Sequence, residues 1–354
     1  MAAAPSGDRR PAGRDGHPLV RPDREGKASR RCRIPLINFG IIQATGRFRP
    51  ASAPTSPSSF GNLSGGSRPM LFTTLSPRLS REEDCVVSMQ LARRLTLRLH
   101  RLRAAQPVVE AIQRRSARFG VQEVADFDGN LRIALDLCEQ AASDIFWCGY
   151  HRPGVVRCLD GLLGPGQVLF DVGARIGEVT LVAAKRVGPS GAVFAFEAQA
   201  AQQRKLAANV AANRLNQVRY VPCDAGAAPG TRPVEARAGR FFGEARAGAG
   251  PRGAATLRAE VTTIDAVAGQ YRLERLDGIR LGGEGRPLAA LRGAASSLAR
   301  FAPWLVVEGV PAQADLAALL PGYRFHRIRS DGEVATLDAP GAGEALLGLP
   351  VARA

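Results

Sequence analysis

Long apolar runs are missing from this sequence. No stretch of about eighteen or more apolar residues occurs along the 354-residue chain, so we expect no transmembrane helix. Residues 1–30 contain no continuous apolar core of the kind that a secretory signal peptide has, so no secretory signal is expected either. Apolar residues still make up 45% of the chain, which is enough for a hydrophobic core in its C-terminal part.

Cysteine is scarce and shows no pairing pattern. The sequence contains no C-x-x-C motif, and the ten-residue spacing of the cysteines at positions 138, 148 and 158 matches no metal-ligand rule, so we expect no metal site. Free, buried thiols in a reducing cytoplasm are the favoured interpretation, and the protein is expected to be cytoplasmic. The cysteines are Cys32, Cys85, Cys138, Cys148, Cys158 and Cys223.

Residues 1–88 lack apolar periodicity except briefly at 34–42, and Arg, Pro, Ser, Gly and Ala dominate them. Such a composition cannot bury enough surface to offset chain entropy, so a disordered basic tail is predicted. Since Met70 and Met89 are internal start candidates, part of this stretch equally fits a reading frame extended too far upstream. The chain has a net charge of +16, but interleaved aromatics and known binding motifs are missing, so a solvated tail is favoured over specific nucleic-acid binding.

A basic amphipathic helix is predicted after this tail, within a segment at residues 89–123. Leu91, Leu95, Leu99 and Leu102 recur at steps of three and four, and arginines at positions 93, 94, 98, 101 and 103 surround them. Packing on the domain or pairing with a second subunit, which would make a homo-oligomer, is the favoured interpretation. Binding to an anionic membrane surface is the alternative.

A strand, a turn, a helix and a second strand are predicted within residues 168–197. The first apolar run ends on Asp171, a turn with Gly173 and Gly177 follows, and residues 178–187 have helical character. After a Gly-Pro-Ser-Gly turn, a second apolar run ends on Glu197. This order is typical of the first half of a nucleotide-binding α/β sheet, in which the ligand lies at the carboxyl ends of the strands.

The glycine spacing favours one class of nucleotide. It reads D-x-G-x-x-x-G, with Arg175 where a middle glycine could stand, and not the G-x-G-x-x-G of a dinucleotide site, so a NAD-dependent oxidoreductase is disfavoured. An acid at the entrance of the turn repels a phosphate but suits an ammonium group, such as the α-amino group of S-adenosylmethionine. Glu197 is placed to accept the hydroxyls of a ribose, which both cofactors contain.

Helices and strands alternate along the rest of the chain and predict an α/β fold with a mostly parallel sheet. Asp128-Gly129 predicts a hairpin before the nucleotide-binding unit, and a Ser-Asp-Gly turn predicts an antiparallel C-terminal hairpin. Residues 225–258, rich in Gly, Ala and Arg, predict weak strands and a mobile loop. Further helices are predicted at 202–213, 264–268, 287–300 and 312–320, and strands at 218–222, 278–281, 304–308, 324–328 and 334–337.

Five blocks lie within residues 126–337: VLFDVGARIGEVTLVAAKRVGPSGAVFAFEAQ, LAANVAANRLNQVRYV, VTTIDAV, LDGIRLGGEGRPLAALRGA and FAPWLVVEG. Together they resemble the FkbM-type S-adenosylmethionine-dependent methyltransferase family. The resemblance implies a Rossmann-like class I methyltransferase domain, placed at residues 124–345, with a seven-stranded, mostly parallel sheet. It also implies S-adenosyl-L-methionine as cofactor and methyl transfer to an oxygen of a small molecule or glycan.

Candidate site residues follow from the turn and the resemblance together. The predicted cofactor-binding residues are Asp171, Gly173, Ala174, Gly177, Glu197 and Asp224, with Asp224 beside the adenine amino group. Glu284, in the stretch that matches the I-D-V-E-G motif of the family, is the predicted catalytic base, although a structural role as acceptor for backbone amides is equally open. Asp224, His151 and His326 are the other candidates for the proton acceptor, but Asp224 suits the adenine better, and His151 and His326 are expected to be ordinary surface or partly buried histidines.

Four positions depart from the family pattern. Arg175 stands in place of an Asn, Arg152 in place of a Glu, Gly282 in place of the Asp of I-D-V-E-G, and Pro287 in place of an acid. Two functional hypotheses therefore stand. The favoured one is an active O-methyltransferase, because the cofactor-side acids are retained. The alternative is a catalytically degenerate protein that keeps the fold and acts as a binding or regulatory module.

Overall fold

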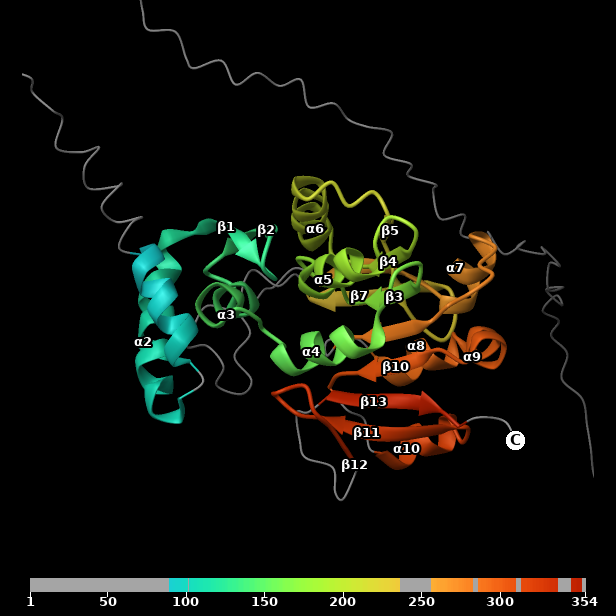
Figure 1. Cartoon of the computed structure of the whole chain (residues 1–354). Helices are drawn as coiled ribbons and strands as arrows, with labels where there is room; N and C mark the ends of the chain where they lie inside the picture. The colour runs from blue at the N-terminus through green and yellow to red at the C-terminus, as the bar shows by residue number, and fades with distance from the viewer. Residues whose placement is uncertain are drawn as a thin grey trace, which may run out of the picture. The chain divides into compact units, whose positions relative to one another are not determined.

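The computed structural model describes residues 89–100, 102–235, 256–282, 286–309, 313–336 and 345–351 (Figure 1). The tail predicted at residues 1–88 lies outside these ranges, as does most of the loop predicted at 225–258. Glu284 and Gly285 also lie outside them.

The central sheet has eight strands. These strands are β3 (Val168–Val172), β4 (Ala192–Phe196), β5 (Val218–Val221), β9 (Gly278–Leu281), β10 (Trp304–Val307), β11 (Tyr323–Ile328), β12 (Val334–Thr336) and β13 (Ala345–Pro350). Their order is β12-β11-β13-β10-β9-β3-β4-β5. From β10 to β5 all neighbours are parallel, whereas β13 is antiparallel to β10 and β11, and β11 is antiparallel to β12. The predicted α/β fold with an antiparallel C-terminal hairpin is confirmed.

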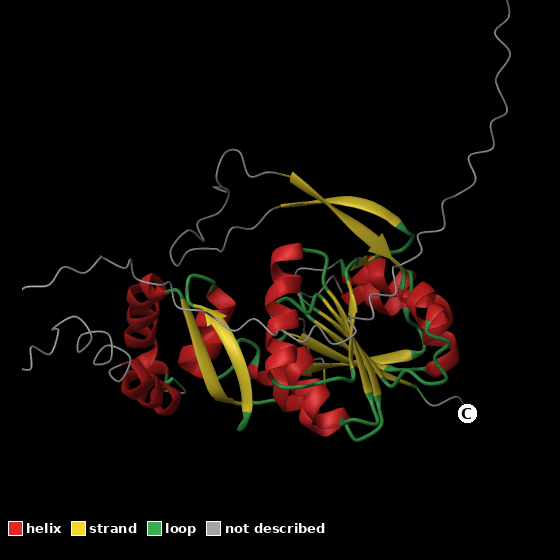
Figure 2. Cartoon of the chain, turned by 90° about the horizontal axis from the view of Figure 1, so that it is seen from above, coloured by secondary structure: helices red, strands yellow, loops and turns green. Residues whose placement is uncertain are grey.

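Helices lie on both sides of this sheet, as Figure 2 shows. They are α4 (Pro153–Leu162), α5 (Glu178–Val187), α6 (Ala200–Ala212), α7 (Ile264–Gln270), α8 (Pro287–Arg292), α9 (Ala295–Phe301) and α10 (Gln313–Leu319). Because both faces are covered, every residue of β3, β9 and β10 is buried, as is typical of parallel strands. None of the helices in the described ranges is long and apolar enough to cross a membrane.

The sheet departs from the sequence-based expectation at β13. This strand was not predicted, and it inserts between β10 and β11, while β12 becomes the edge strand. The central sheet therefore has eight strands where the resemblance implied seven. The single helix predicted at residues 287–300 is also wrong, since α8 ends at Arg292 and α9 begins at Ala295. A Cβ at position 293 would lie 2.0 Å from the Gly226 carbonyl oxygen, so the chain approaches a neighbouring turn too closely for a larger residue.

A smaller sheet confirms the weak strands predicted after the third parallel strand. It consists of β6 (Asp224–Ala225), β7 (Gly230–Glu235) and β8 (Thr256–Thr262), in the order β6-β8-β7. Strand β8 is parallel to β6 and antiparallel to β7.

The chain before β3 forms a helical segment and a hairpin. After a helix at residues 89–99 come two 3-10 turns, η1 (Arg103–Ala105) and η2 (Ala117–Phe119), which flank α2 (Gln106–Ser116). The hairpin strands β1 (Val121–Phe127) and β2 (Leu131–Asp136) follow, and then α3 (Gln140–Cys148). Asp128 and Gly129 lie in the predicted hairpin turn, which spans residues 128–130 between the paired residues Phe127 and Leu131, and both have left-handed φ values, +48° and +92°.

The helix at residues 89–99 turns its leucine stripe outward. Leu91 and Leu95 are 59% and 57% exposed, whereas Arg93 is only 6% exposed. Arg93 donates from Nε to the Phe146 carbonyl oxygen at 3.0 Å and pairs with Asp126 at 2.8 Å. The helix thus packs on the domain, as one of the predicted alternatives held, but through Met89, Arg93 and Thr96 and not through the leucines.

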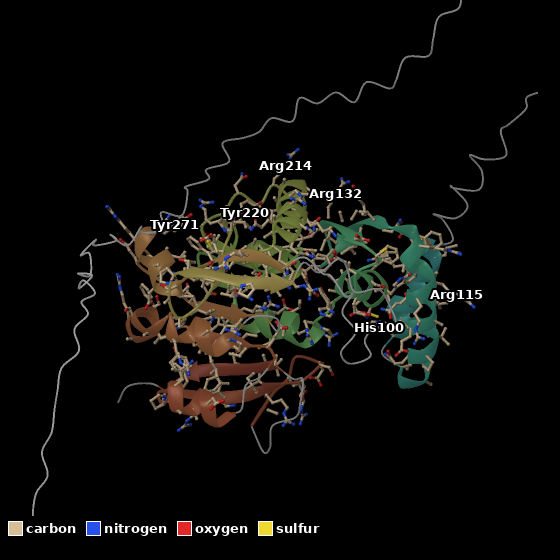
Figure 3. The ribbon with its side chains drawn as sticks, turned by 180° about the vertical axis from the view of Figure 1, so that it is seen from behind. His100, Arg115, Arg132, Arg214, Tyr220 and Tyr271 are labelled. Carbon is tan, nitrogen blue, oxygen red and sulfur yellow. The ribbon has the colours of Figure 1, made fainter. Side chains whose placement is uncertain are left out.

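Cationic side chains and thiols occupy different environments. Arg115 and Arg214 both project away from the ribbon in Figure 3, and both are exposed. The cysteines in the described ranges form no disulfide: Cys158 and Cys223 are buried, and Cys138 and Cys148 are half-buried. Burial raises the pKa of Cys148 and of Cys158 to about 11, so both thiols stay protonated at neutral pH.

Within the described residues, no group of three His, Cys, Asp or Glu side chains is arranged to hold a metal ion.

Candidate active site

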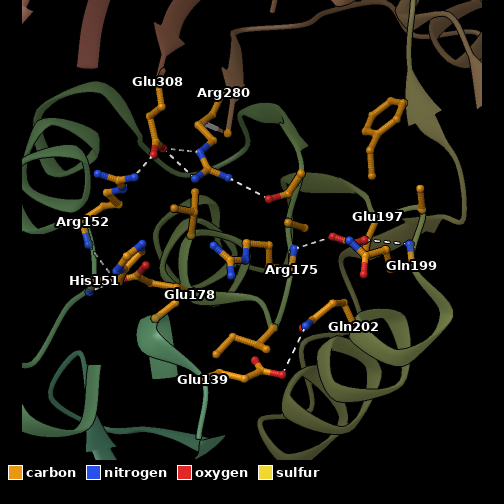
Figure 4. A pocket seen from close by; sticks show the side chains of 18 of the residues that line it. Glu139, His151, Arg152, Arg175, Glu178, Glu197, Gln199, Gln202, Arg280 and Glu308 are labelled. Atoms are coloured by element: carbon orange, nitrogen blue, oxygen red, sulfur yellow. Dashed lines mark hydrogen bonds and ion pairs between the residues drawn. The ribbon is translucent and has the colours of Figure 1, made fainter. Parts of the chain in front are cut away.

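A cavity of about 320 Å³ lies where the central strands end. Strand β3 leads into Gly173, β4 into Glu197, β9 into Gly282 and β10 into Glu308, and all of these residues line the cavity (Figure 4). The chain runs outward from β3 to β4 and β5 and then returns to β9, on the other side of β3. This reversal makes the carboxyl end of β3 a topological switch point, where ligands of α/β proteins bind.

The turn after β3 is held in a conformation that depends on glycine. Gly173 and Gly177 have φ of +76° and +100°, and a Cβ on Gly177 would lie 2.7 Å from a methyl group of Leu206. The backbone N–H groups of Gly173 and Ala174 both donate to the Phe196 carbonyl oxygen at 2.9 Å. Gly173 and Ala174 line the cavity, whereas Gly177 precedes α5 and shapes the turn from behind.

Glu197 lies in the cavity wall with its carboxylate orientation fixed by the backbone. Its Oε2 accepts the N–H of Arg175 at 2.9 Å, and its Oε1 accepts the N–H of Gln199 at 2.8 Å. The side chain is 7% exposed. Arg175 adopts φ of +54°, so the position where the family pattern has Asn is a left-handed one, which Asn tolerates better than most residues.

Asp171 lies beneath the cavity and does not line it. It is fully buried within β3, where Arg280 donates from Nη1 to its Oδ1 at 2.9 Å and Thr180 donates from Oγ1 to its Oδ2 at 2.5 Å. Arg280 therefore neutralises the carboxylate of Asp171, which the sequence hypothesis expected to attract an ammonium group. The role of Asp171 in cofactor binding stays a prediction.

Arg280 connects two buried acids at the floor of the cavity. Besides Asp171, it pairs through Nη2 with Glu308 at 2.6 Å, and Glu308 in turn pairs with Nε of Arg152 at 3.2 Å. Burial by itself would lower the pKa of Arg280, but the carboxylates of Glu308 and Asp171 outweigh burial and raise the pKa. Glu308 was not predicted as a site residue, although it follows an apolar strand just as Glu197 does.

Gly282 faces the same guanidinium. A Cβ at this position would lie 3.0 Å from Nη1 of Arg280 and 3.1 Å from the carbonyl oxygens of Val172 and Gly173. The backbone of Gly282 therefore lies close to the Arg280 guanidinium at the floor of the cavity. This leaves little space at position 282 for the side chain of the aspartate that the family pattern has there. Glu308 supplies a carboxylate to Arg280 within this floor.

Asp224 also lines the cavity, and both of its oxygens are engaged. Oδ1 accepts the N–H of Ala225 at 2.9 Å, and Oδ2 pairs with Arg232 of β7. Arg232 itself lines the cavity. The smaller sheet thus brings a cation next to the residue that was predicted to bind adenine.

His151 and Glu178 form the wall opposite Glu197, with Arg175 between them in Figure 4. The Oε1 atom of Glu178 accepts the backbone N–H groups of His151 at 2.7 Å and of Arg152 at 3.4 Å. Burial raises the pKa of Glu178. Sequence reasoning treated His151 as an ordinary histidine, because a lone histidine carries no signal of the cavity that the fold builds around it.

The remaining predicted residues lie elsewhere. Glu284 and Gly285 are outside the described residues, so the catalytic role of Glu284 stays a prediction. Pro287 is the first residue of α8, where the missing N–H costs nothing. His326 lies on β11 opposite Thr336, away from the residues that line the cavity.

Comparisons with known proteins agree with the sequence pattern. Residues 171–329 match a family model described as the methyltransferase FkbM domain. No curated protein matches the chain significantly.

Several solved structures are similar at low sequence identity. A methyltransferase FkbM from Methylobacillus flagellatus is 19% identical, with a TM-score of 0.37; the match covers 54% of this chain and 47% of that one, so this chain spans less than half of that relative's length. A putative rRNA methylase from Clostridium thermocellum is 10% identical over 55% of this chain and 92% of that one, with a TM-score of 0.36. An S-adenosylmethionine-dependent O-methyltransferase from Thermotoga maritima is 14% identical over 56% and 64%, with a TM-score of 0.33.

Proposed function

We propose that this chain, whose residues 171–329 match the methyltransferase FkbM domain, transfers the methyl group of S-adenosylmethionine to a hydroxyl oxygen of a small metabolite or glycan. The observation that carries this proposal is the placement of Glu197. Its buried carboxylate ends β4 at the switch point of the sheet, beside the glycine turn, and the backbone fixes its orientation. This is the position at which α/β nucleotide sites bind a ribose.

The residues of the cavity fit S-adenosylmethionine. A volume of about 320 Å³ lies within the range of small-molecule sites. A Cβ on Gly173 would have Gly282 Cα, at 3.8 Å, as its nearest neighbour, so the two glycines keep the cavity open between β3 and β9. We assign the ribose to Glu197, the adenine end to Asp224 with Arg232, and the methionine end to the turn at Gly173 and Ala174.

Methyl transfer to oxygen makes modest demands on the protein. S-adenosylmethionine, when bound, supplies a methyl group on a sulfonium that is already a good leaving group. The chain must align the acceptor hydroxyl with that methyl group, exclude water, and accept one proton.

Calorimetric titration of the full chain with S-adenosylmethionine tests this function. Glu197→Ala should weaken binding by about 1.5–3 kcal/mol, as expected for hydrogen bonds to a charged group. Glu333→Ala, at an exposed carboxylate near β12, is the matched control and should bind like the parent. Equal affinity in the Glu197 variant would show that the ribose assignment is wrong.

A binding or regulatory module without turnover is the second candidate, and the crowding at Gly282 favours it. The position of the family aspartate has little room for a side chain, so one acid of the family pattern is missing from the cavity. Incubation with tritiated S-adenosylmethionine and a panel of methyl glycosides separates the two candidates. Cofactor binding without label transfer to any acceptor would favour the module, and label transfer would favour the enzyme.

A further inference from the structure

His151 and Asp144 form a hydrogen-bonded pair at the cavity wall. Nδ1 of His151 lies 2.8 Å from Oδ2 of Asp144, and the two side chains are 20% and 23% exposed. His151 lies in the loop before α4 and lines the cavity, whereas Asp144 lies on α3 behind it.

The contacts of Asp144 determine which ring nitrogen of His151 carries the proton. Its other oxygen, Oδ1, accepts the side-chain amides of Gln113 and Gln140, both at 2.9 Å. An ionised carboxylate only accepts hydrogen bonds, so the proton shared with His151 belongs to Nδ1 of the ring. Nε2, on the far side of the ring, then carries the lone pair.

The ring is also oriented through its backbone. The His151 N–H donates to Oε1 of Glu178 at 2.7 Å, so the loop is tied to the first turn of α5. A side chain fixed at its ring by one acid and at its backbone by another keeps a constant direction. Such support is what a proton-transfer group needs.

The acids of the described cavity wall are each engaged by a cation or a backbone N–H group. Glu308 pairs with Arg280 and Arg152, Asp224 pairs with Arg232, and Glu139 pairs with Lys205. Glu197 and Glu178 each accept backbone N–H groups. The interactions of Glu308, Asp224, Glu139 and Glu197 favour the ionised but weakly basic form of each acid. Burial raises the pKa of Glu178, but its Oε1 is occupied by the backbone N–H groups of His151 and Arg152. Imidazole is basic enough to take a proton near neutral pH.

We propose that His151 is the general base of the methyl transfer and that Asp144 is its positioning residue; this proposal rests on the proposed function. Nε2 of His151 takes the proton of the acceptor hydroxyl as the hydroxyl oxygen bonds to the methyl carbon. The carbon–sulfur bond breaks and its electron pair stays on sulfur, so the products are a methyl ether, S-adenosylhomocysteine and an imidazolium. Asp144 stabilises that imidazolium until its proton passes to water.

The proposal predicts that the ring of His151 senses the charge of the cofactor sulfur. Charged groups face the ring or its loop from the elements around it: Asp144 on α3, Glu178 on α5, Arg175 in the turn after β3, and the neighbouring Arg152. These protein groups are the same in the complex with S-adenosylmethionine and in the complex with S-adenosylhomocysteine. S-adenosylmethionine adds a sulfonium charge that S-adenosylhomocysteine lacks, so only the first would oppose protonation of a ring that lines the same cavity.

Proton NMR titration of the full chain measures this effect directly. The chain has four histidines, and the His151 signal is identified by its loss in His151→Gln. With saturating S-adenosylmethionine, the His151 titration midpoint should lie about half a pH unit or more below the midpoint with S-adenosylhomocysteine. His326 on β11 is the internal control and should titrate alike in both complexes.

The outcomes separate the two proposals. If calorimetry shows that S-adenosylmethionine binds but His151 titrates identically in both complexes, the base assignment is wrong and the proposed function stands. If neither compound binds, both proposals are overturned. A lower midpoint with the sulfonium compound supports both.

Asp144→Asn tests the positioning role. Loss of the carboxylate should lower the fraction of neutral His151 rings that carry their proton on Nδ1, because a neutral amide is a weaker acceptor than a carboxylate. The ¹⁵N chemical shifts of the ring measure this fraction in the ligand-free chain. Asp160→Asn, which removes a carboxylate paired with Arg186 elsewhere, should not change it. An unchanged fraction in the Asp144 variant would show that the pair is merely structural.

Activity provides a further test once any methyl glycoside accepts label. His151→Gln should lower kcat by about 100-fold to 10,000-fold, with little effect on cofactor affinity. Undiminished kcat would overturn the base assignment and shift attention to Glu284.

Discussion

At the scale of single residues, the buried charges under the cavity have the largest predicted energetic effect. Arg280 lies between Asp171 and Glu308, and all three side chains are almost fully buried. Arg280→Met should destabilise the protein by about 3–5 kcal/mol, because it leaves two carboxylates in the interior without their cation. Urea denaturation of the two proteins gives this difference.

An exposed pair provides the control for Arg280. Arg114 pairs with Glu110 at 3.1 Å one turn apart on α2, and both side chains are more than half exposed. Arg114→Met should therefore cost under about 1 kcal/mol. Equal costs for the two methionine variants would contradict the structural importance of the buried network.

Glu178 makes stability depend on pH in a direction that can be tested. Burial raises its folded-state pKa, so the folded protein holds this proton more tightly than the unfolded chain. Ionisation then costs stability as the pH rises above the usual glutamate range. In Glu178→Gln, the difference in melting temperature, variant minus parent, should increase between pH 4 and pH 8.

The same measurement on Glu333→Gln serves as the control, since that carboxylate is largely exposed. Its difference from the parent should stay nearly constant over this range. A constant difference for the Glu178 variant as well would show that its folded-state pKa is not raised.

Local sequence patterns predicted some residues of the cavity and missed others. Gly173 and Glu197 were found because a glycine turn and a strand-ending acid are visible within a short stretch. Arg280 and Asp171 are 109 residues apart, and only the pairing of β3 with β9 brings them together. His151 was considered as a proton acceptor but set aside as an ordinary histidine, and Asp144 was missed, because the cavity beside them exists only in the folded chain.

At the scale of elements, the contact between β9 and β10 depends on one glycine. Gly278 is paired with Trp304, and a Cβ at position 278 would lie 2.1 Å from the Trp304 ring. Gly278→Ala should lower the melting temperature by several degrees, because the ring or the strand must move. A thermal melt of the variant measures this shift.

Gly161 in α4 is the matched control, since a Cβ there would meet nothing within 4 Å. Gly161→Ala should leave the melting temperature unchanged or raise it, because alanine favours the helix by about 0.5–1 kcal/mol over glycine. A loss of stability in this variant, or none at position 278, would contradict the packing described for these elements.

Elements were predictable where their pattern is local. Residues 178–187 and 278–281 were predicted with the bounds that the structure has, because helical periodicity and a short buried run are strong signals. Strand β13 was missed since its partners β10 and β11 come earlier in the chain and nothing in ALLGLP indicates their pairing. The break between α8 and α9 reflects a tertiary contact at Gly293 that periodicity does not show.

At the scale of the whole molecule, the alternation of helices and strands was enough to predict the fold class, because parallel strands need helical crossovers. The orientation of the helix at residues 89–99 was not predictable in this way. Hydropathy predicts that the leucines face a core. Arg93 is the buried side chain instead, because Asp126 neutralises its guanidinium and the Phe146 carbonyl oxygen accepts a hydrogen bond from it.

The N-terminal boundary of the folded unit follows from the same contacts. Met89 is 7% exposed and belongs to the hydrophobic core, and Arg93 and Thr96 are buried behind it. Residues 1–88 show apolar periodicity only briefly, at residues 34–42. A chain that starts at Met89 should therefore melt cooperatively within a few degrees of the full-length protein.

A chain that starts at Gln106 is the informative comparison. It removes Arg93, which leaves the Phe146 carbonyl oxygen without its donor and uncovers the surface beneath Met89 and Thr96. Losing a buried charge-assisted hydrogen bond together with that packing should cost roughly 3 kcal/mol or more, so this chain should melt well below the one that starts at Met89. If the two shortened chains melt alike, the helix at residues 89–99 is not part of the folded unit; if the longer one fails to fold, residues 1–88 contribute contacts that their composition does not indicate.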